Sequence, residues 1–74
     1  MTLIEFIDVF AEQFDETPKT YFTPSTQFKT LADWSSLTAL SIIAMIDEEM
    51  GQNINSEVIK SSNTVEELFN KIPQ

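Results

Sequence analysis

Apolar residues recur at helical spacing in two long stretches of the chain. The first runs from Thr2 to about Phe14, and at about 100° per residue one face collects Leu3, Ile7, Phe10, Ala11 and Phe14. Thr2 stands three residues before Glu5, which is the spacing of a capping box. This pattern predicts a first helix that starts after Thr2.

The second stretch runs from about Ser36 to Met50 and stops before Gly51, a residue suited to the left-handed end of a helix. Ser35 or Ser36 is expected to cap its start, because a serine oxygen accepts an unpaired first-turn amide. The arc predicted to be buried comprises Ala39, Leu40, Ile42, Ile43, Ile46 and Met50. The opposite side carries Thr38, Ser41, Glu48 and Glu49, with Leu37, Ala44 and Met45 at its margins and Asp47 projecting sideways into solvent.

The remaining segments complete an all-α prediction. After a turn over 52–55, a short helix from Ser56 to Lys60 contributes Val58 and Ile59. Asn63 or Thr64 caps a last helix, because Glu66 and Glu67 stand three residues beyond each. The inner face of that helix comprises Val65, Leu68, Phe69 and Ile72.

The connection over residues 15–35 breaks the helical pattern, since Thr17-Pro18 and Thr23-Pro24 oppose helix continuation. It is nevertheless too apolar for a free linker, with Tyr21, Phe22, Phe28, Leu31 and Trp34. We expect a loop pinned to the core by these side chains, with a helical turn near 26–31 and Trp34 as a lid. Residues 1–74 are thus predicted to form one domain, a four-helix bundle with a short third helix and a long first loop.

Composition mainly excludes classes of chemistry. The 74 residues include twelve acids, four lysines and one glycine, but no histidine or cysteine, which gives a net charge of −8. The chain therefore cannot form a Ser–His nucleophile pair, a thiolate metal site or a glycine-rich phosphate loop, because the residues that each requires are missing. The paired acids at 15–16, 47–49 and 66–67 diverge around a helix and are interpreted as solvated faces. We predict no catalytic residue and no metal site, and therefore no enzyme.

The acidity favours protein partners with basic surfaces and opposes binding to nucleic acid. The simpler interpretation is that the charge only keeps the protein soluble. Glu5 and Asp8 interrupt any apolar signal segment, and the apolar window from Ala39 to Ile46 is too short to span a bilayer. A cytoplasmic monomer is the resulting expectation.

Ser36 lies at the N-terminus of the predicted second helix, and its position there has both a structural and a functional interpretation. A serine in this position is usually a cap. The start of a helix also offers free amides and a positive dipole end, which would favour a phosphodiester attached to the hydroxyl. Because the chain has no histidine and offers no local base to activate this hydroxyl, Ser36 is better suited to modification by another protein than to catalysis.

At this point the sequence resembles the acyl carrier protein family and the related peptidyl carrier domains. The match starts at Ser35-Ser36-Leu37, against the Asp-Ser-Leu signature that opens the family's second helix, and continues through Leu40, Ile43, Ile46, Asp47-Glu48-Glu49, Met50-Gly51 and Ile54. It covers nearly the whole chain in length and helix order. The resemblance implies that Ser36 carries 4′-phosphopantetheine, whose thiol holds acyl or aminoacyl groups as thioesters for fatty acid or polyketide biosynthesis.

The resemblance also implies partners, namely a phosphopantetheinyl transferase and acyl-loading and condensing enzymes with basic docking surfaces. The expected contact residues are Ser35, Leu37, Ser41, Ala44, Met45, Asp47 and Glu48. Such exposed contacts make docking weak and salt-sensitive, although Leu37 and Met45 can also be read as half-buried bundle residues. The bundle interior is expected to shelter the attached chain among Phe6 or Phe10, Ile42, Ile43, Ile46, Ile59, Leu68 and Phe69.

Two departures from the family pattern keep alternatives open. Ser35 replaces the aspartate that helps the loading transferase, and Asp33 is expected to substitute for it in part. Thr38 and Ser41 stand where acids are frequent, which favours dedicated partners. A second hypothesis is therefore a carrier-like interaction module with an unmodified Ser36, and a third is an acidic protein that occupies a basic groove on a target.

Overall fold

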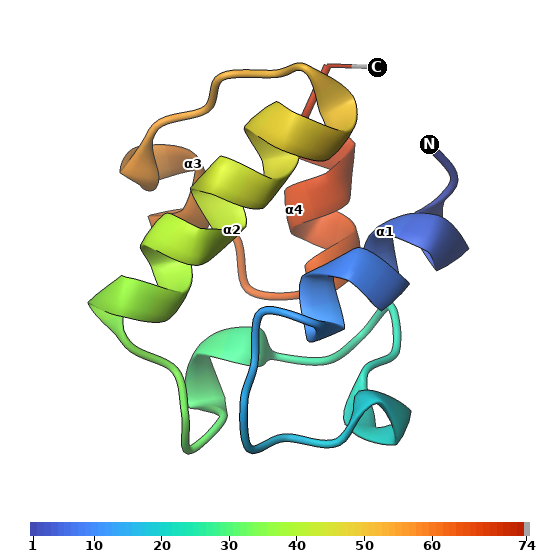
Figure 1. The fold of residues 1–74 in the computed structure, drawn as a ribbon, viewed down its shortest axis with the longest axis vertical. Coiled ribbons are helices and arrows are strands. Elements are labelled where there is room, and N and C mark those ends of the chain that lie inside the picture. Colours follow the sequence, from blue (N-terminus) through green and yellow to red (C-terminus); the bar gives the residue numbers. More distant parts are fainter. Residues whose placement is uncertain (74) are drawn as a thin grey trace.

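The computed structural model describes residues 1–73, so Gln74, the last residue of the predicted domain, lies outside the described residues. The helices are α1 (Leu3–Ala11), α2 (Ser36–Met50), α3 (Ser56–Lys60) and α4 (Val65–Lys71) (Figure 1). Two 3₁₀ turns, Lys19–Tyr21 and Phe28–Thr30, interrupt the connection between α1 and α2. No strand occurs in residues 1–73, and the predicted all-α architecture with a short third helix is confirmed.

Local hydrogen bonds fix most helix ends where the sequence predicts them. Thr2 Oγ1 accepts from the Glu5 amide at 3.2 Å, and Glu5 Oε1 accepts from the Thr2 amide at 2.8 Å. Thr64 and Glu67 form the same capping box at the start of α4, which selects Thr64 rather than Asn63 as the cap. Helix α2 ends at Gly51, whose φ of 65° is left-handed.

The first helix is shorter than predicted. It ends at Ala11, because the next amides bond three residues back instead of four, from Gln13 to Phe10 O and from Phe14 to Ala11 O, both at 3.1 Å. This tighter turn still leaves Phe14 buried in the core. The chain then runs on into the long loop.

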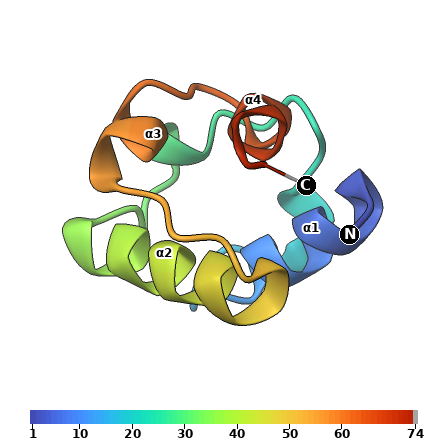
Figure 2. The same ribbon diagram turned by 90° about the horizontal axis from the view of Figure 1, so that it is seen from above.

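The helices close into a ring around a common core. Helix α1 packs against α2 and α4, and α3 packs against the same two helices (Figure 2). Phe10 lies fully buried with four other phenylalanine rings around it, at centroid distances of 5.2–6.0 Å. The side chains buried most completely are Phe6, Phe10, Phe28, Ile42, Ile46, Ile59, Val65 and Leu68. None of the helices in the described part of the chain is long and apolar enough to cross a membrane.

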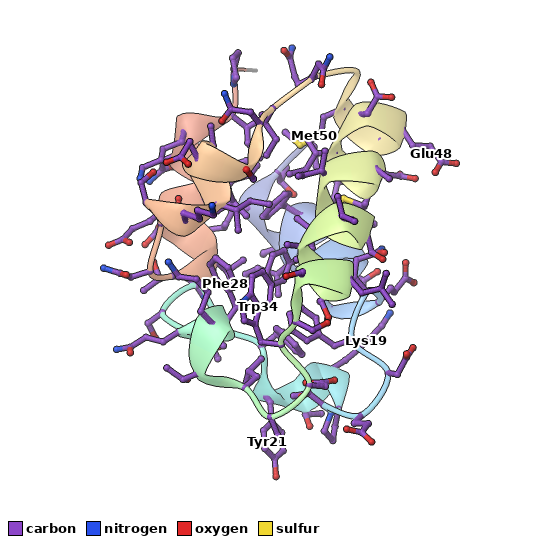
Figure 3. All side chains as sticks on the ribbon, turned by 90° about the vertical axis from the view of Figure 1, so that its left-hand side faces the viewer. Lys19, Tyr21, Phe28, Trp34, Glu48 and Met50 are labelled. Carbon is purple, nitrogen blue, oxygen red and sulfur yellow. The ribbon has the colours of Figure 1, made fainter. Side chains whose placement is uncertain are left out.

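The long loop belongs to this packed structure. Phe22 and Phe28 are buried, and Leu31 and Trp34 pack against the core, as predicted. Tyr21 is the exception, because it is 65% exposed and points away from the molecule (Figure 3). Backbone oxygens of Pro24 and Thr26 accept hydrogen bonds from first-turn amides of α4, at 3.0 and 3.2 Å, which pair donors that a helix start leaves free.

The predicted orientation of α2 is partly wrong. Its buried residues are Thr38, Ile42, Met45 and Ile46, whereas Leu40 is 62% exposed. Thr38 can face the core because its hydroxyl donates to the Asp33 carbonyl at 3.0 Å, which pairs the polar group. Helix α2 therefore has a core face and, beside it, an apolar edge on which Ile43 packs partly against the core while Leu40 is exposed.

Candidate functional site

The two serines at the start of α2 have different roles. Ser35 is the N-cap, and its Oγ accepts from the Thr38 amide at 3.3 Å and lies 3.2 Å from the Thr38 hydroxyl. Ser36 is the first helical residue and is exposed. Within residues 1–73 its hydroxyl has no hydrogen-bond partner. The capping role thus falls to Ser35, and the exposed Ser36 hydroxyl takes no part in the cap.

The electrostatic setting of Ser36 differs from that of the other helix starts. Helix α2 has no acid in its first turn, whereas α1, α3 and α4 carry Glu5, Glu57 and Glu66 with Glu67, respectively. The free amides and the positive dipole end of this 15-residue helix are therefore not neutralised by a local carboxylate. An anion attached to Ser36 Oγ would be stabilised there.

Asp33 fixes the segment that leads into this helix start. Its carboxylate accepts hydrogen bonds from the amides of Glu16 and Thr17, at 3.0 and 3.2 Å, and from the Thr17 hydroxyl at 2.7 Å. The bond from the Thr17 hydroxyl is the main reason why the pKa of Asp33 lies below its ordinary value of 3.8. Because both carboxylate oxygens are engaged within the chain, Asp33 is poorly placed to substitute for the family's aspartate.

Changing Asp33 to asparagine should lower the melting temperature at neutral pH. The melting temperature of the variant should also fall less steeply than that of the wild type as the pH is lowered. Since the pKa of Asp33 is lowered in the folded protein, its contribution is complete above the unfolded pKa and is lost as the pH falls through the folded one. Thermal unfolding of both proteins from pH 7 down to about pH 2 measures this. The two melting curves should converge as the pH falls below about 4; a constant difference would contradict the role assigned to Asp33.

A cleft of about 370 Å³ lies beside Ser36, between α2, α3 and the end of the long loop. Its lining comprises Lys29, Trp34, Ser35, Ser36, Ala39, Leu40, Ile43, Ser56, Ile59 and Lys60. Ser36, Leu40 and Ile43 follow one another at spacings of four and three residues, so they form one stripe along α2. The exposed Leu40 therefore belongs to the wall of a cleft that starts at the free hydroxyl.

The cleft is not the interior pocket that the sequence analysis predicts. Of the residues expected to shelter a chain, only Ile43 and Ile59 line it. Phe6, Phe10, Ile42, Ile46 and Leu68 are fully buried in the packed core. The space lies between α2 and α3, along the side of α2 that carries Leu40 and Ile43, because a different side with Thr38 and Ile42 is turned into the core.

Most of the expected partner-contact residues are accessible, with one clear correction. Leu37 is 74% exposed, and Ser35, Ala44, Asp47 and Glu48 are exposed as well, while Ser41 is half-buried. Figure 3 shows Glu48 projecting away from α2. Met45 is only 5% exposed, so the prediction that it supplies apolar contact to partners is wrong. It lies three residues beyond Ile42 and packs with it in the core.

Trp34 closes the core beneath the start of α2. Its ring stacks on Phe14 at a centroid distance of 6.2 Å and meets Phe28 edge to face at 5.2 Å. The predicted lid role is therefore confirmed, and the same side chain forms part of the cleft wall.

No family model matches this chain, and neither does any curated protein sequence or solved structure.

Proposed function

We propose that the protein is an acyl carrier protein, which carries acyl or aminoacyl groups as thioesters on a 4′-phosphopantetheine arm attached to Ser36. It presents them to partner enzymes of fatty acid, polyketide or related biosynthesis and is not itself an enzyme. The observation that carries this proposal is the Ser36 hydroxyl, which is exposed, free of hydrogen bonds within residues 1–73 and placed beside an apolar cleft.

The chain's own residues fit the attachment step. Ser36 Oγ attacks the phosphorus nearest the pantetheine of coenzyme A; a new O–P bond forms to the serine while the P–O bond of the pyrophosphate breaks, and the nucleotide half leaves as adenosine 3′,5′-bisphosphate. The proton of the hydroxyl passes to a base on the transferase, since the chain has no histidine to accept it. The first-turn amides of α2 then stabilise the phosphodiester charge. When attached, the arm supplies the thiol that holds the cargo.

The exposed face of α2 supports weak, reversible docking. Leu37 and Ala44 offer apolar contact, and the exposed carboxylates of Asp47, Glu48 and Glu49 suit lysine or arginine on a partner. Exposed ion pairs of this kind contribute at most about 1 kcal/mol each and weaken with salt. Such docking suits a shuttle that visits several enzymes.

Incubation with coenzyme A and a set of phosphopantetheinyl transferases tests the proposal. We expect the intact mass to rise by one phosphopantetheine, and fragmentation to place the addition on Ser36. No gain with any transferase would contradict the proposal and favour the interaction module. The observation that favours that second candidate is Ser35, which stands in place of the signature aspartate.

The Ser35→Asp variant should be loaded about tenfold faster by a housekeeping transferase. It restores the Asp-Ser-Leu signature, and one charge-assisted contact of about 1.5 kcal/mol corresponds to that factor. Aspartate caps helices as well as serine does, so the fold should persist with little change in stability. Rates are measured by the time course of the mass gain. Asn53→Asp, which adds the same charge at an exposed position outside the motif, is the matched control and should load as the wild type does.

A further inference from the structure

The cleft beside Ser36 has a charge opposite to that of the whole protein. The sequence contains twelve acids and four lysines. Two of those lysines, Lys29 and Lys60, line the cleft, and no acid among the described residues does. The positive end of the α2 dipole lies at the same place, through Ser35 and Ser36. A ligand in this cleft therefore meets positive charge on a protein of net charge −8.

The ammonium group of Lys29 retains donors for a ligand. Its Nζ donates to the Lys60 carbonyl at 2.7 Å, which uses one of three N–H groups and holds the side chain at the end of α3. Within residues 1–73 no carboxylate lies at salt-bridge distance from it, although its charge adds a minor lowering to the pKa of Glu67. Lys29 is thus positioned without being neutralised.

Lys60 is similarly little engaged. Its Nζ lies 3.8 Å from a Glu57 carboxylate oxygen, a long pair between two exposed side chains that contributes little energy. Lys19, outside the cleft, shows the contrast, because it lies between Asp8 at 3.0 Å and Glu12 at 3.2 Å. Unlike Lys19, the two lysines at the cleft therefore keep spare capacity to bind an anion; Lys71, which donates to the carbonyl and the hydroxyl of Ser61, does not line the cleft.

We propose that the cleft selects cargo that carries its own negative charge, namely an acyl group with a carboxylate at its far end. This inference rests on the proposed attachment at Ser36. Trp34, Leu40 and Ile59 would cover the apolar part of the acyl group, while the ammonium groups of Lys29 and Lys60 bind the carboxylate. A purely alkyl group of the same length would make no ionic contact with either ammonium group, so it would gain nothing from the two lysines.

The test compares two cargoes on the same protein. The carrier is loaded at Ser36 with six-carbon acyl groups that differ only at the far end, one with a methyl group and the other with a carboxylate. We expect the thioester of the carboxylate-ended group to hydrolyse about threefold to tenfold more slowly, the size expected from two partly exposed ion pairs. The melting temperature of that form should also be the higher of the two.

In the Lys29→Gln/Lys60→Gln double variant, the thioesters of the two cargoes should hydrolyse at the same rate. Because Lys29 also bonds the Lys60 carbonyl, the variant itself is expected to be less stable, so only the difference between cargoes within each protein is compared. Lys71→Gln is the matched control. Lys71 also donates to a main-chain oxygen, that of Ser61 at 2.7 Å, but it does not line the cleft, and this variant should keep the difference.

Each other outcome overturns a defined part of the inference. Equal hydrolysis of both cargoes on the wild type rejects charge selection and leaves the attachment at Ser36 intact. A difference that survives in the double variant rejects the role of the two lysines. If the double variant changes the hydrolysis rates of both thioesters by the same factor, the lysines act on the phosphodiester that both forms share, and binding of the carboxylate is rejected. Failure to load, seen first as an unchanged intact mass, rejects the proposed function and this inference with it.

Discussion

The Ser36→Ala variant is expected to lose phosphopantetheine attachment completely while its free energy of unfolding stays within about 0.5 kcal/mol of the wild-type value. The hydroxyl is the proposed nucleophile, and it makes no hydrogen bond to any part of the chain that the structure describes. Alanine is also the best helix former at an exposed helical position. Intact mass after treatment with a transferase measures attachment, and thermal unfolding measures stability.

The Ser35→Ala variant should give the opposite result. It removes the oxygen that accepts from the Thr38 amide, and loss of such a cap costs about 0.5–2 kcal/mol. Ser36 remains, so attachment should still occur, and the pair of variants separates capping from reactivity. Attachment that persists in Ser36→Ala and disappears in Ser35→Ala would move the modified residue to Ser35 and contradict the assignment.

The Phe10→Ala variant should suffer the largest loss of stability, about 3–5 kcal/mol. Phe10 is fully buried, and the rings of Phe6, Phe14, Phe22 and Phe28 surround it. A domain of this size is typically stable by only about 4–11 kcal/mol. At about 4–8 °C per kcal/mol, the melting temperature should fall by about 12 °C or more. Urea unfolding followed by circular dichroism gives the free energy directly.

Ile4→Ala is the matched control for this prediction, because Ile4 lies on the same helix and is 81% exposed. Removal of the Ile4 side chain beyond Cβ should change the free energy of unfolding by less than about 0.5 kcal/mol. A loss below about 1 kcal/mol in Phe10→Ala would show that the phenylalanine cluster can close around the vacated space and that Phe10 does not hold α1 and the long loop together.

The helix boundaries could be predicted because the signals that set them are local. Both capping boxes join residues three apart, and the bounds of α2 follow from a serine at one end and the left-handed Gly51 at the other. The end of α1 was missed by about three residues. No cap or breaker marks that position in the sequence, and the tighter turn there coincides with the burial of Phe14.

The orientation of α2 could not be predicted from its apolar residues alone. Ala39, Leu40, Ile42, Ile43, Met45 and Ile46 span too wide an arc for one face, and the hydropathy of Thr38 argues against its burial. The Asp33 carbonyl, five residues earlier in the segment that leads into the helix, makes that burial acceptable by accepting from the Thr38 hydroxyl. The same rotation buries Met45 and leaves Leu40 beside the cleft. The exposure of Tyr21 is likewise a consequence of how the loop packs.

The sequence by itself determined the number and order of the helices, the candidate caps at the starts of three of them and the serine that the family resemblance selects. Those features depend on side chains and amides within four residues of one another. Only the tertiary structure decided where the cleft lies and that Lys29 and Lys60 meet there, thirty-one positions apart in the chain. Contacts over such separations depend on how the helices and the loop pack together, which no local pattern of residues specifies.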